Sequence, residues 1–387
     1  MKKTLAALAV LGAFAAGSVY AADVELYGIV DLGLKYTHND YDGAQDDADK
    51  LEMASGSQSS SRFGLKGSED LGNGLKVGFV LENGFNADDG SLGNNSRLFG
   101  RESQVNLSGA FGTLSFGRVG QINSANGSYG ITGIFSPFGT SWAGSVEGST
   151  YMVGYSRIDN TVTYVSPEFA GVKIYAQYSF DVNTKTKSDE GKSNADRYYG
   201  IGATYKTGPL SLVAVVDSYN WSSLRTPNPA TDDDTDDGYT VTLGGNYDFG
   251  FMKAYLGAQY FDNMFKKTYD ANSGKDQDTY AAIGTTTGQF QGYGITAGVD
   301  APVLGGTAMF AVGYSDTEQT ESDAAGIKEE MTRIGASIGY TYNLSKRTNV
   351  YGVASYYQDS YDNYQNKDGN DYDPSTAILW LGMRHKF

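Results

Sequence analysis

The chain has 387 residues, with 29 basic residues against 45 acidic ones and no cysteine. The acidic balance disfavours nucleic acid as a partner, because a negative surface repels the phosphate backbone. The lack of cysteine excludes a disulfide framework and thiolate metal sites, and the 51 Gly, 30 Tyr and 18 Phe disfavour a large helical domain.

The first 22 residues have the three parts of a secretory signal peptide. Lys2 and Lys3 precede an apolar run from Leu5 to Ala16, and small residues follow up to Ala22. We expect cleavage after Ala22, which leaves residues 23–387 as a single exported domain. Because no other window offers about 18 consecutive apolar residues, we expect no transmembrane helix.

Alternating apolar and polar residues then predict a series of β-strands. In 239–249, Tyr239, Val241 and Leu243 share one face, while Thr240 and Thr242 share the other. The sixteen expected strands are 24–37, 60–70, 75–86, 96–108, 113–119, 159–166, 172–180, 196–206, 210–218, 239–249, 252–261, 289–300, 307–315, 333–344, 349–358 and 375–387.

The connections between these strands differ regularly in length. Seven are short turns, such as the one at Asn73-Gly74, and the eight that alternate with them are long and polar, such as the acidic 38–57. A β-sandwich mixes long and short connections at both ends, whereas a transmembrane barrel keeps them at opposite ends. We therefore predict an all-β protein, a transmembrane sixteen-stranded antiparallel β-barrel with short periplasmic turns and long external loops.

The connection 120–156 is unlike the other long ones, because Glu147 is its only charged side chain. It contains Ile134, Phe135, Phe138 and Trp142, so it has the composition of a segment that packs against something. Its place after the fifth strand indicates that it packs inside the barrel, with these four residues as anchors on the inner wall.

Several stretches resemble one known family. The sequence of 59–85, SSSRFGLKGSEDLGNGLKVGFVLENGF, that of 96–118, SRLFGRESQVNLSGAFGTLSFGR, and the ending LGMRHKF resemble the general porins of Gram-negative bacteria, in particular the beta-proteobacterial and neisserial type. The resemblance implies a homotrimer in the cell outer membrane, in which the third external loop, here 120–156, folds inward as a constriction. It also implies that the terminal Phe387 is read by the outer-membrane assembly machinery.

Strand parity predicts which charged side chains face the lumen. With Phe63 and Val162 facing outward, Arg62, Lys66, Arg157 and Asp159 face inward, whereas strict alternation places Arg97, Arg101 and Arg118 outside unless a bulge reverses it. By the same reasoning Arg384 lies at the periplasmic mouth. The candidate constriction residues are Arg62, Lys66, Arg97, Arg101, Arg118, Glu147, Arg157 and Asp159.

Two interpretations of these charges stay open. In the first, Arg62, Lys66, Arg157 and one of Arg97 or Arg101 form a basic wall that faces Glu147 and screens solutes. In the second, the arginines pair with Glu82, Glu102 or Asp159 in structural networks. Because the acidic loops and the basic wall favour opposite ions, the sequence leaves the sign of the selectivity undecided.

The function predicted from the sequence is a water-filled channel for passive diffusion of small hydrophilic solutes and ions. A channel selective for sugars or organic anions and a non-conducting adhesin barrel are the alternatives. His38 and His385 are the only histidines and lie at opposite ends of the predicted barrel, so we expect no enzyme activity. We expect no cofactor, apart from weak divalent cations at acidic loops such as 232–237, where they could bridge to lipopolysaccharide.

Overall fold

The structure is a computed structural model that describes residues 23–43, 46–139, 142, 146, 151–154, 157–185, 188–192, 194–221, 236–264, 289–320, 328, 330–365 and 371–387. Within these residues, none of the helices has the length and apolar character needed to cross a membrane.

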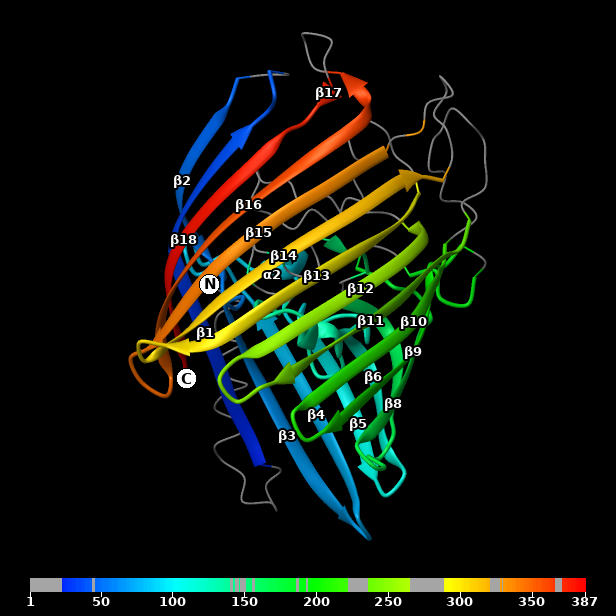
Figure 1. Ribbon diagram of the computed structural model, residues 1–387. Helices are drawn as coiled ribbons and strands as arrows, with labels where there is room; N and C mark the ends of the chain where they lie inside the picture. The colour runs from blue at the N-terminus through cyan, green and yellow to red at the C-terminus, as the bar shows by residue number, and fades with distance from the viewer. Residues whose placement is uncertain are drawn as a thin grey trace, which may run out of the picture.

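The strands form one antiparallel sheet that closes on itself, because β1 pairs with β18 from Ile29↔Lys386 to Asp40↔Ser375 (Figure 1). The strands are β1 (Asp23–Asp40), β2 (Ala48–Ser55), β3 (Arg62–Gly72), β4 (Leu75–Gly84), β5 (Glu102–Gly109), β6 (Gly112–Gly120), β7 (Arg157–Val165), β8 (Val172–Ser179), β9 (Arg197–Thr207), β10 (Leu210–Asn220), β11 (Gly238–Asp248), β12 (Lys253–Met264), β13 (Phe290–Val303), β14 (Gly306–Gln319), β15 (Glu330–Asn343), β16 (Thr348–Gln365), β17 (Asp371–Tyr372) and β18 (Ser375–Lys386).

These 18 segments make sixteen barrel strands, because β2 with β3 and β17 with β18 are each one strand that is interrupted. β1 pairs with β3 along its first part and with β2 along its second part. The prediction of a sixteen-stranded antiparallel barrel is confirmed.

Several predicted boundaries are wrong; the strand expected at 349–358, for example, runs to Gln365. The stretch 38–57 was expected to be an acidic loop, but β1 continues to Asp40 and β2 occupies Ala48–Ser55. β2 forms because Leu51 and Met53 face outward on alternate positions, a pattern that the aspartates on either side obscured. The strand expected at 96–108 starts only at Glu102, after a turn, α2 (Gly93–Ser96), in which Asn94 and Asn95 have positive φ.

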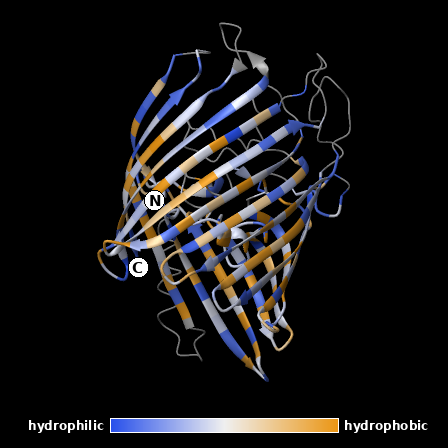
Figure 2. Ribbon diagram, viewed as in Figure 1, coloured by the Kyte–Doolittle hydropathy of each residue, from blue (hydrophilic) through white to orange (hydrophobic). Residues whose placement is uncertain are grey.

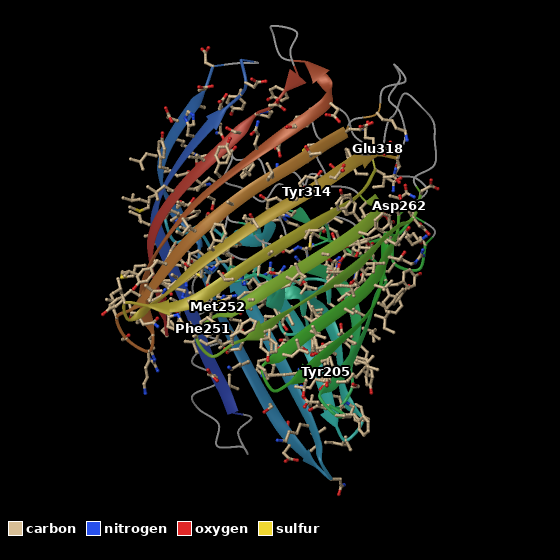
Figure 3. The ribbon with its side chains drawn as sticks, in the orientation of Figure 1. Tyr205, Phe251, Met252, Asp262, Tyr314 and Glu318 are labelled. Carbon is tan, nitrogen blue, oxygen red and sulfur yellow. The ribbon has the colours of Figure 1, made fainter. Side chains whose placement is uncertain are left out.

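Short and long connections lie at opposite ends of the barrel (Figure 1). Phe251, in the turn between β11 and β12, is at the short-turn end, while Asp262 and Glu318 lie near the long-connection end (Figure 3). The two ends therefore differ in length of loop and in charge.

The outer surface is an apolar band with aromatic borders. Apolar and polar residues alternate along the strands (Figure 2), and Leu243 and Leu256 are among the exposed apolar residues. Near the long-connection end Tyr239 and Tyr260 on neighbouring strands lie 6.1 Å apart, and toward the other end Phe249 is exposed. Such a band with two aromatic girdles is typical of a barrel that is surrounded by lipid.

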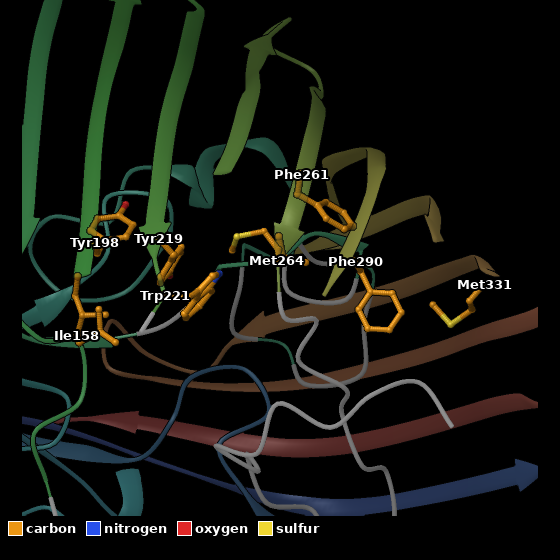
Figure 4. Close-up of a cluster of buried hydrophobic side chains, with 10 residues drawn as sticks. Ile158, Tyr198, Tyr219, Trp221, Phe261, Met264, Phe290 and Met331 are labelled. Carbon is orange, nitrogen blue, oxygen red and sulfur yellow. The ribbon is translucent and has the colours of Figure 1, made fainter. Parts of the chain in front are cut away.

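Part of the inner wall is apolar as well. Near the long-connection end, the rings of Tyr219 and Trp221 stack with centroids 4.7 Å apart, and Phe261 is fully buried beside them (Figure 4). Val153, near the far end of the connection 120–156, and Ile158, at the start of β7, pack into this cluster. The cluster therefore anchors one end of that connection to the wall.

Candidate functional site

The connection between β6 and β7 packs against glycines on the inner wall. Its short 3₁₀ helix η1 (Thr132–Phe135) ends in Phe135, which is 0% exposed. Gly244 and Gly257 stand opposite each other in the β11–β12 ladder, and a Cβ on either would lie within 2.7 Å of Phe135 atoms. Because only glycine leaves room there, the pair forms a seat for the Phe135 ring.

A second seat holds Tyr151. Gly313 and Gly335 are partners in the β14–β15 ladder, and a Cβ on Gly313 would lie 2.7 Å from the Tyr151 ring. Phe138 lies in the same way over Gly339 of β15. The described residues of 120–154 therefore contact the inner faces of β11, β12, β14 and β15.

Polar wall residues hold the backbone of the same connection. Gln259 accepts a hydrogen bond from Val153 N at 2.6 Å and donates one to Val153 O at 3.1 Å. Ser337 Oγ accepts from Val146 N at 2.7 Å. Buried backbone groups need hydrogen-bond partners, and these side chains supply them. They therefore hold the connection in place inside the barrel.

A cluster of arginines lies beside the start of this connection. Arg101 Nε donates to Glu82 Oε1 at 2.7 Å, and Tyr27 donates to the same carboxylate at 3.0 Å. Arg62 Nη1 lies 3.8 Å from Glu82 Oε1. Glu82 thus holds two guanidinium groups on the inner wall.

Two further arginines belong to this cluster. Arg157 donates to Asn126 Oδ1 at 2.9 Å and lies close enough to Arg101 and Arg62 for their charges to interact. Arg384 stands opposite Asp31 in the β1–β18 ladder and also acts electrostatically on Arg62. We call Arg62, Arg101, Arg157 and Arg384 the arginine cluster.

The neighbouring carboxylates Asp31 and Glu102 are more deeply buried than Arg62. The Arg62 side chain is 22% exposed, whereas Asp31 is 0% and Glu102 is 3% exposed. Glu102 accepts a hydrogen bond from Ser128 N at 3.1 Å, so it faces the connection rather than open water. Arg62 therefore offers more exposed charge than these two carboxylates, whereas Arg101, at 5% exposed, is buried to a similar degree as they are.

Arg384 lies close to the short-turn end on one side, as the sequence predicted. Its partner on β16 is Asn349, the second residue after the short turn 344–347. On its other side it stands opposite Asp31, and β1 continues past that level to Asp23, because a closed barrel staggers its neighbouring strands.

Lys66 lies apart from the cluster. Its Nζ is 3.1 Å from Glu25 and 5.1 Å from the centre of the Tyr27 ring, nearer to the short-turn end of β3. Lys66 therefore pairs locally and does not contact the arginines.

Arg97, Arg118 and Asp159 form a second group beside the arginine cluster. Asp159 Oδ1 accepts from Arg118 at 2.6 Å, and Asp159 Oδ2 accepts from Arg97 at 2.9 Å. The β6–β7 register shifts between Gly117 and Val119, and Asn160 has a φ of 50°. Because this bulge interrupts the alternation, parity counted from Val162 does not carry through to Asp159.

Glu147 lies outside the described residues. Arg62, Arg101 and Arg157 come together, and the group of Arg97, Arg118 and Asp159 adjoins them through Arg118, which donates to Arg157 O at 3.3 Å. Lys66 does not join them. That these residues constrict the channel stays a prediction. Among the described residues, no group of three or more His, Cys, Asp or Glu could hold a metal ion.

Sequence reasoning missed Tyr27 and Asp31 in this site, and it did not bring Arg384 together with Arg62. Tyr27 and Asp31 sit at alternate positions of β1, so parity applied to that strand could have placed both on the inner face.

The chain was compared with known proteins. The family described as Gram-negative porin matches residues 5–363. An outer membrane porin protein of Bordetella pertussis is 32% identical over 415 residues, which cover 100% of both chains. Outer membrane porin protein 32 of Delftia acidovorans is 31% identical over 91% of this chain and 88% of its own. A solved structure described as an anion-selective porin from Comamonas acidovorans has a TM-score of 0.63 and 26% identity, over 95% of this chain and 100% of that one.

Proposed function

Since the chain belongs to the Gram-negative porin family and is an outer-membrane channel for passive diffusion of small hydrophilic solutes, we propose that its arginine cluster makes it prefer anions. The observation that carries this proposal is the difference in exposure between Arg62 and the buried carboxylates Asp31 and Glu102. The similar structure described as anion-selective supports the same sign.

The size of the effect is sufficient for selectivity. A unit charge at about 4 Å from an ion contributes about 1 kcal/mol in bulk water and about 4 kcal/mol at an effective dielectric constant of 20. An anion gains this energy and a cation loses it. One net positive charge at a narrow point therefore changes the anion-to-cation ratio at least several-fold.

The connection 120–156 places this cluster at a narrow point in our proposal. Its described residues cross from the seat on β11 and β12 to the seat on β14 and β15. Space on the inner side of the barrel is thereby filled, and ions are led past the arginines at its start.

The test is the reversal potential of the Arg62→Gln variant in a KCl gradient across a planar bilayer. We expect it to shift toward that of a non-selective channel. Arg97→Gln is the matched control, because Arg97 is also ion-paired and its side chain is 19% exposed against 22% for Arg62. Equal shifts in both variants, or none in either, would contradict the proposal.

Three partners also belong to the proposal. We expect a homotrimer, which would run as a heat-sensitive band of higher mass on unheated gels. The assembly machinery would read Phe387, whose side chain is exposed and whose backbone pairs with Gly28. Lipopolysaccharide would bind at the acidic external loops through divalent cations.

A further inference from the structure

A second segment, besides 120–156, lies on the inner wall. Between the pairs Ile29↔Arg62 and Leu32↔Ser55, the six residues 56–61 stand against only Val30 and Asp31 of β1. A regular ladder would need two residues there. The surplus chain must leave the plane of the wall, and we call it the β2–β3 insert.

The contacts of the insert show that it turns inward. Gln58 Oε1 accepts a hydrogen bond from Asn349 Nδ2 at 2.7 Å, and Ser59 Oγ accepts one from Arg384 at 2.8 Å. Asn349 is buried on β16, and Arg384 belongs to the arginine cluster on β18. The insert therefore lies over the inner faces of strands that come from the other end of the chain.

Asp31 fixes the insert at its centre. Ser59 N donates to Asp31 Oδ2 at 2.7 Å, Gly56 N donates to Asp31 O at 2.9 Å, and Tyr351 donates to Asp31 Oδ1. The Asp31 side chain is fully buried, so Ser59 N and the Tyr351 hydroxyl replace the water that an exposed carboxylate would have. Hydrogen bonds to an ionised acceptor are about twice as strong as neutral ones.

The insert also meets the connection 120–156 through one residue. The Tyr351 ring packs edge-on against Trp142, with centroids 5.3 Å apart, and Trp142 in turn packs against Phe138 at 5.5 Å. The insert ends at Ser61, directly before Arg62 of the arginine cluster. Its position therefore bears on both the wall and the charges of the narrow region.

We propose that the β2–β3 insert is a second pore-lining segment, and that Asp31 is the positioning residue that holds it against the inner wall. Within the insert Gln58 is 8% exposed and Ser60 is the exposed residue. The inference rests on the channel being open and does not depend on its preference for anions. A failed reversal-potential test would refute the anion preference and leave the labelling test below unaffected.

The absence of cysteine from the chain makes a clean labelling experiment available. In Gln58→Cys, the thiolate displaces methanesulfinate from a cationic methanethiosulfonate reagent and forms a mixed disulfide. Mass spectrometry measures the extent of labelling. We expect labelling to lower the conductance of each pore in one step. Lys346→Cys, in the exposed turn after β15, is the control, and its labelling should leave the conductance unchanged.

Asp31→Asn in the Gln58→Cys background tests the positioning role. The weaker acceptor loosens the insert, so we expect the labelling rate to rise about tenfold. Tyr351→Phe removes one donor to Asp31 but keeps the ring on Trp142, and it should raise the rate less. Both should leave the heat stability of the barrel nearly unchanged, which separates positioning from a general loss of structure.

Each other outcome contradicts part of the proposal. If Gln58→Cys resists the reagent, or is labelled without a fall in current, the insert does not line the conducting path. If labelling of Lys346→Cys lowers the conductance by the same amount, the fall in Gln58→Cys is not evidence that the insert lines the conducting path. If the labelling rate is the same with Asp31→Asn as without it, Asp31 does not position the insert.

Discussion

Glu82 is the residue on which the arginine cluster depends most directly. It receives hydrogen bonds from Arg101 at 2.7 Å and Tyr27 at 3.0 Å and lies 3.8 Å from Arg62. Removing one partner of a buried ion pair usually destabilises a protein, because the other charge is left uncompensated. Here the remaining charges are guanidinium groups beside a water-filled path, so the main consequence should be electrostatic.

We expect Glu82→Gln to strengthen the anion preference, because it removes a negative charge and retains an acceptor for Arg101. The reversal potential in a KCl gradient measures the change. Glu25→Gln is the control, since Glu25 pairs with Lys66 away from the cluster. A weaker anion preference in Glu82→Gln than in the unmodified protein would show that the arginines lose their positions without Glu82.

At the scale of elements, paired glycines decide where the inward connection lies. Gly244 and Gly257 adjoin in the β11–β12 ladder beneath Phe135, and Gly313 and Gly335 adjoin in the β14–β15 ladder beneath Tyr151. The wall and the connection therefore fit by shape, with aromatic rings where two strands both lack a side chain.

Gly257→Val should lower the single-channel conductance, because the new side chain meets Phe135 and pushes η1 toward the lumen. Overpacking of this kind costs about 1 to 3 kcal/mol. Phe135→Ala combined with Gly257→Val should restore much of the conductance, since the removed ring makes room. Ala258→Val is the control, because it changes the next residue of the same strand, which faces outward, and it should leave the conductance unchanged. The decisive result is the restored conductance of the double variant. If the conductance is not restored, Phe135 does not sit on Gly257 as described.

The same elements explain what the sequence could predict. Strict alternation in 239–249 and the regular exchange of short and long connections were sufficient for the barrel, since both follow from the local period of two. The composition of 120–156 was sufficient to indicate inward packing of Phe135, Phe138 and Trp142, all of which are buried.

The site was less accessible to such reasoning, because parity holds only while the ladder is regular. The shift between Gly117 and Val119 breaks it next to Asp159, and the stagger of the closed barrel brings Arg384 level with Asp31. The β2–β3 insert has no alternation of its own, and only its contacts across the closed sheet show its direction. These are long-range properties that a local pattern does not contain.

At the scale of the whole molecule, the acidic chain and the basic cluster act on different parts of the channel. The chain carries a formal net charge of −16, and Asp40 and Asp49 lie at the long-connection end of β1 and β2. Asp40 is nine residues from Asp31 along β1, or about 30 Å at about 3.3 Å per residue. Electrostatic effects decay over about 8 Å at physiological ionic strength but over about 30 Å at 0.01 M salt. The acidic rim therefore opposes the cluster only in dilute salt.

The most direct test of the central claim is the reversal potential of the unmodified protein in a planar bilayer, with KCl at 0.1 M on one side and 1 M on the other. At these concentrations the acidic rim is screened from the arginine cluster. We expect a potential whose sign corresponds to chloride passing more readily than potassium. A potential of the opposite sign would contradict the assignment of selectivity to Arg62, Arg101, Arg157 and Arg384.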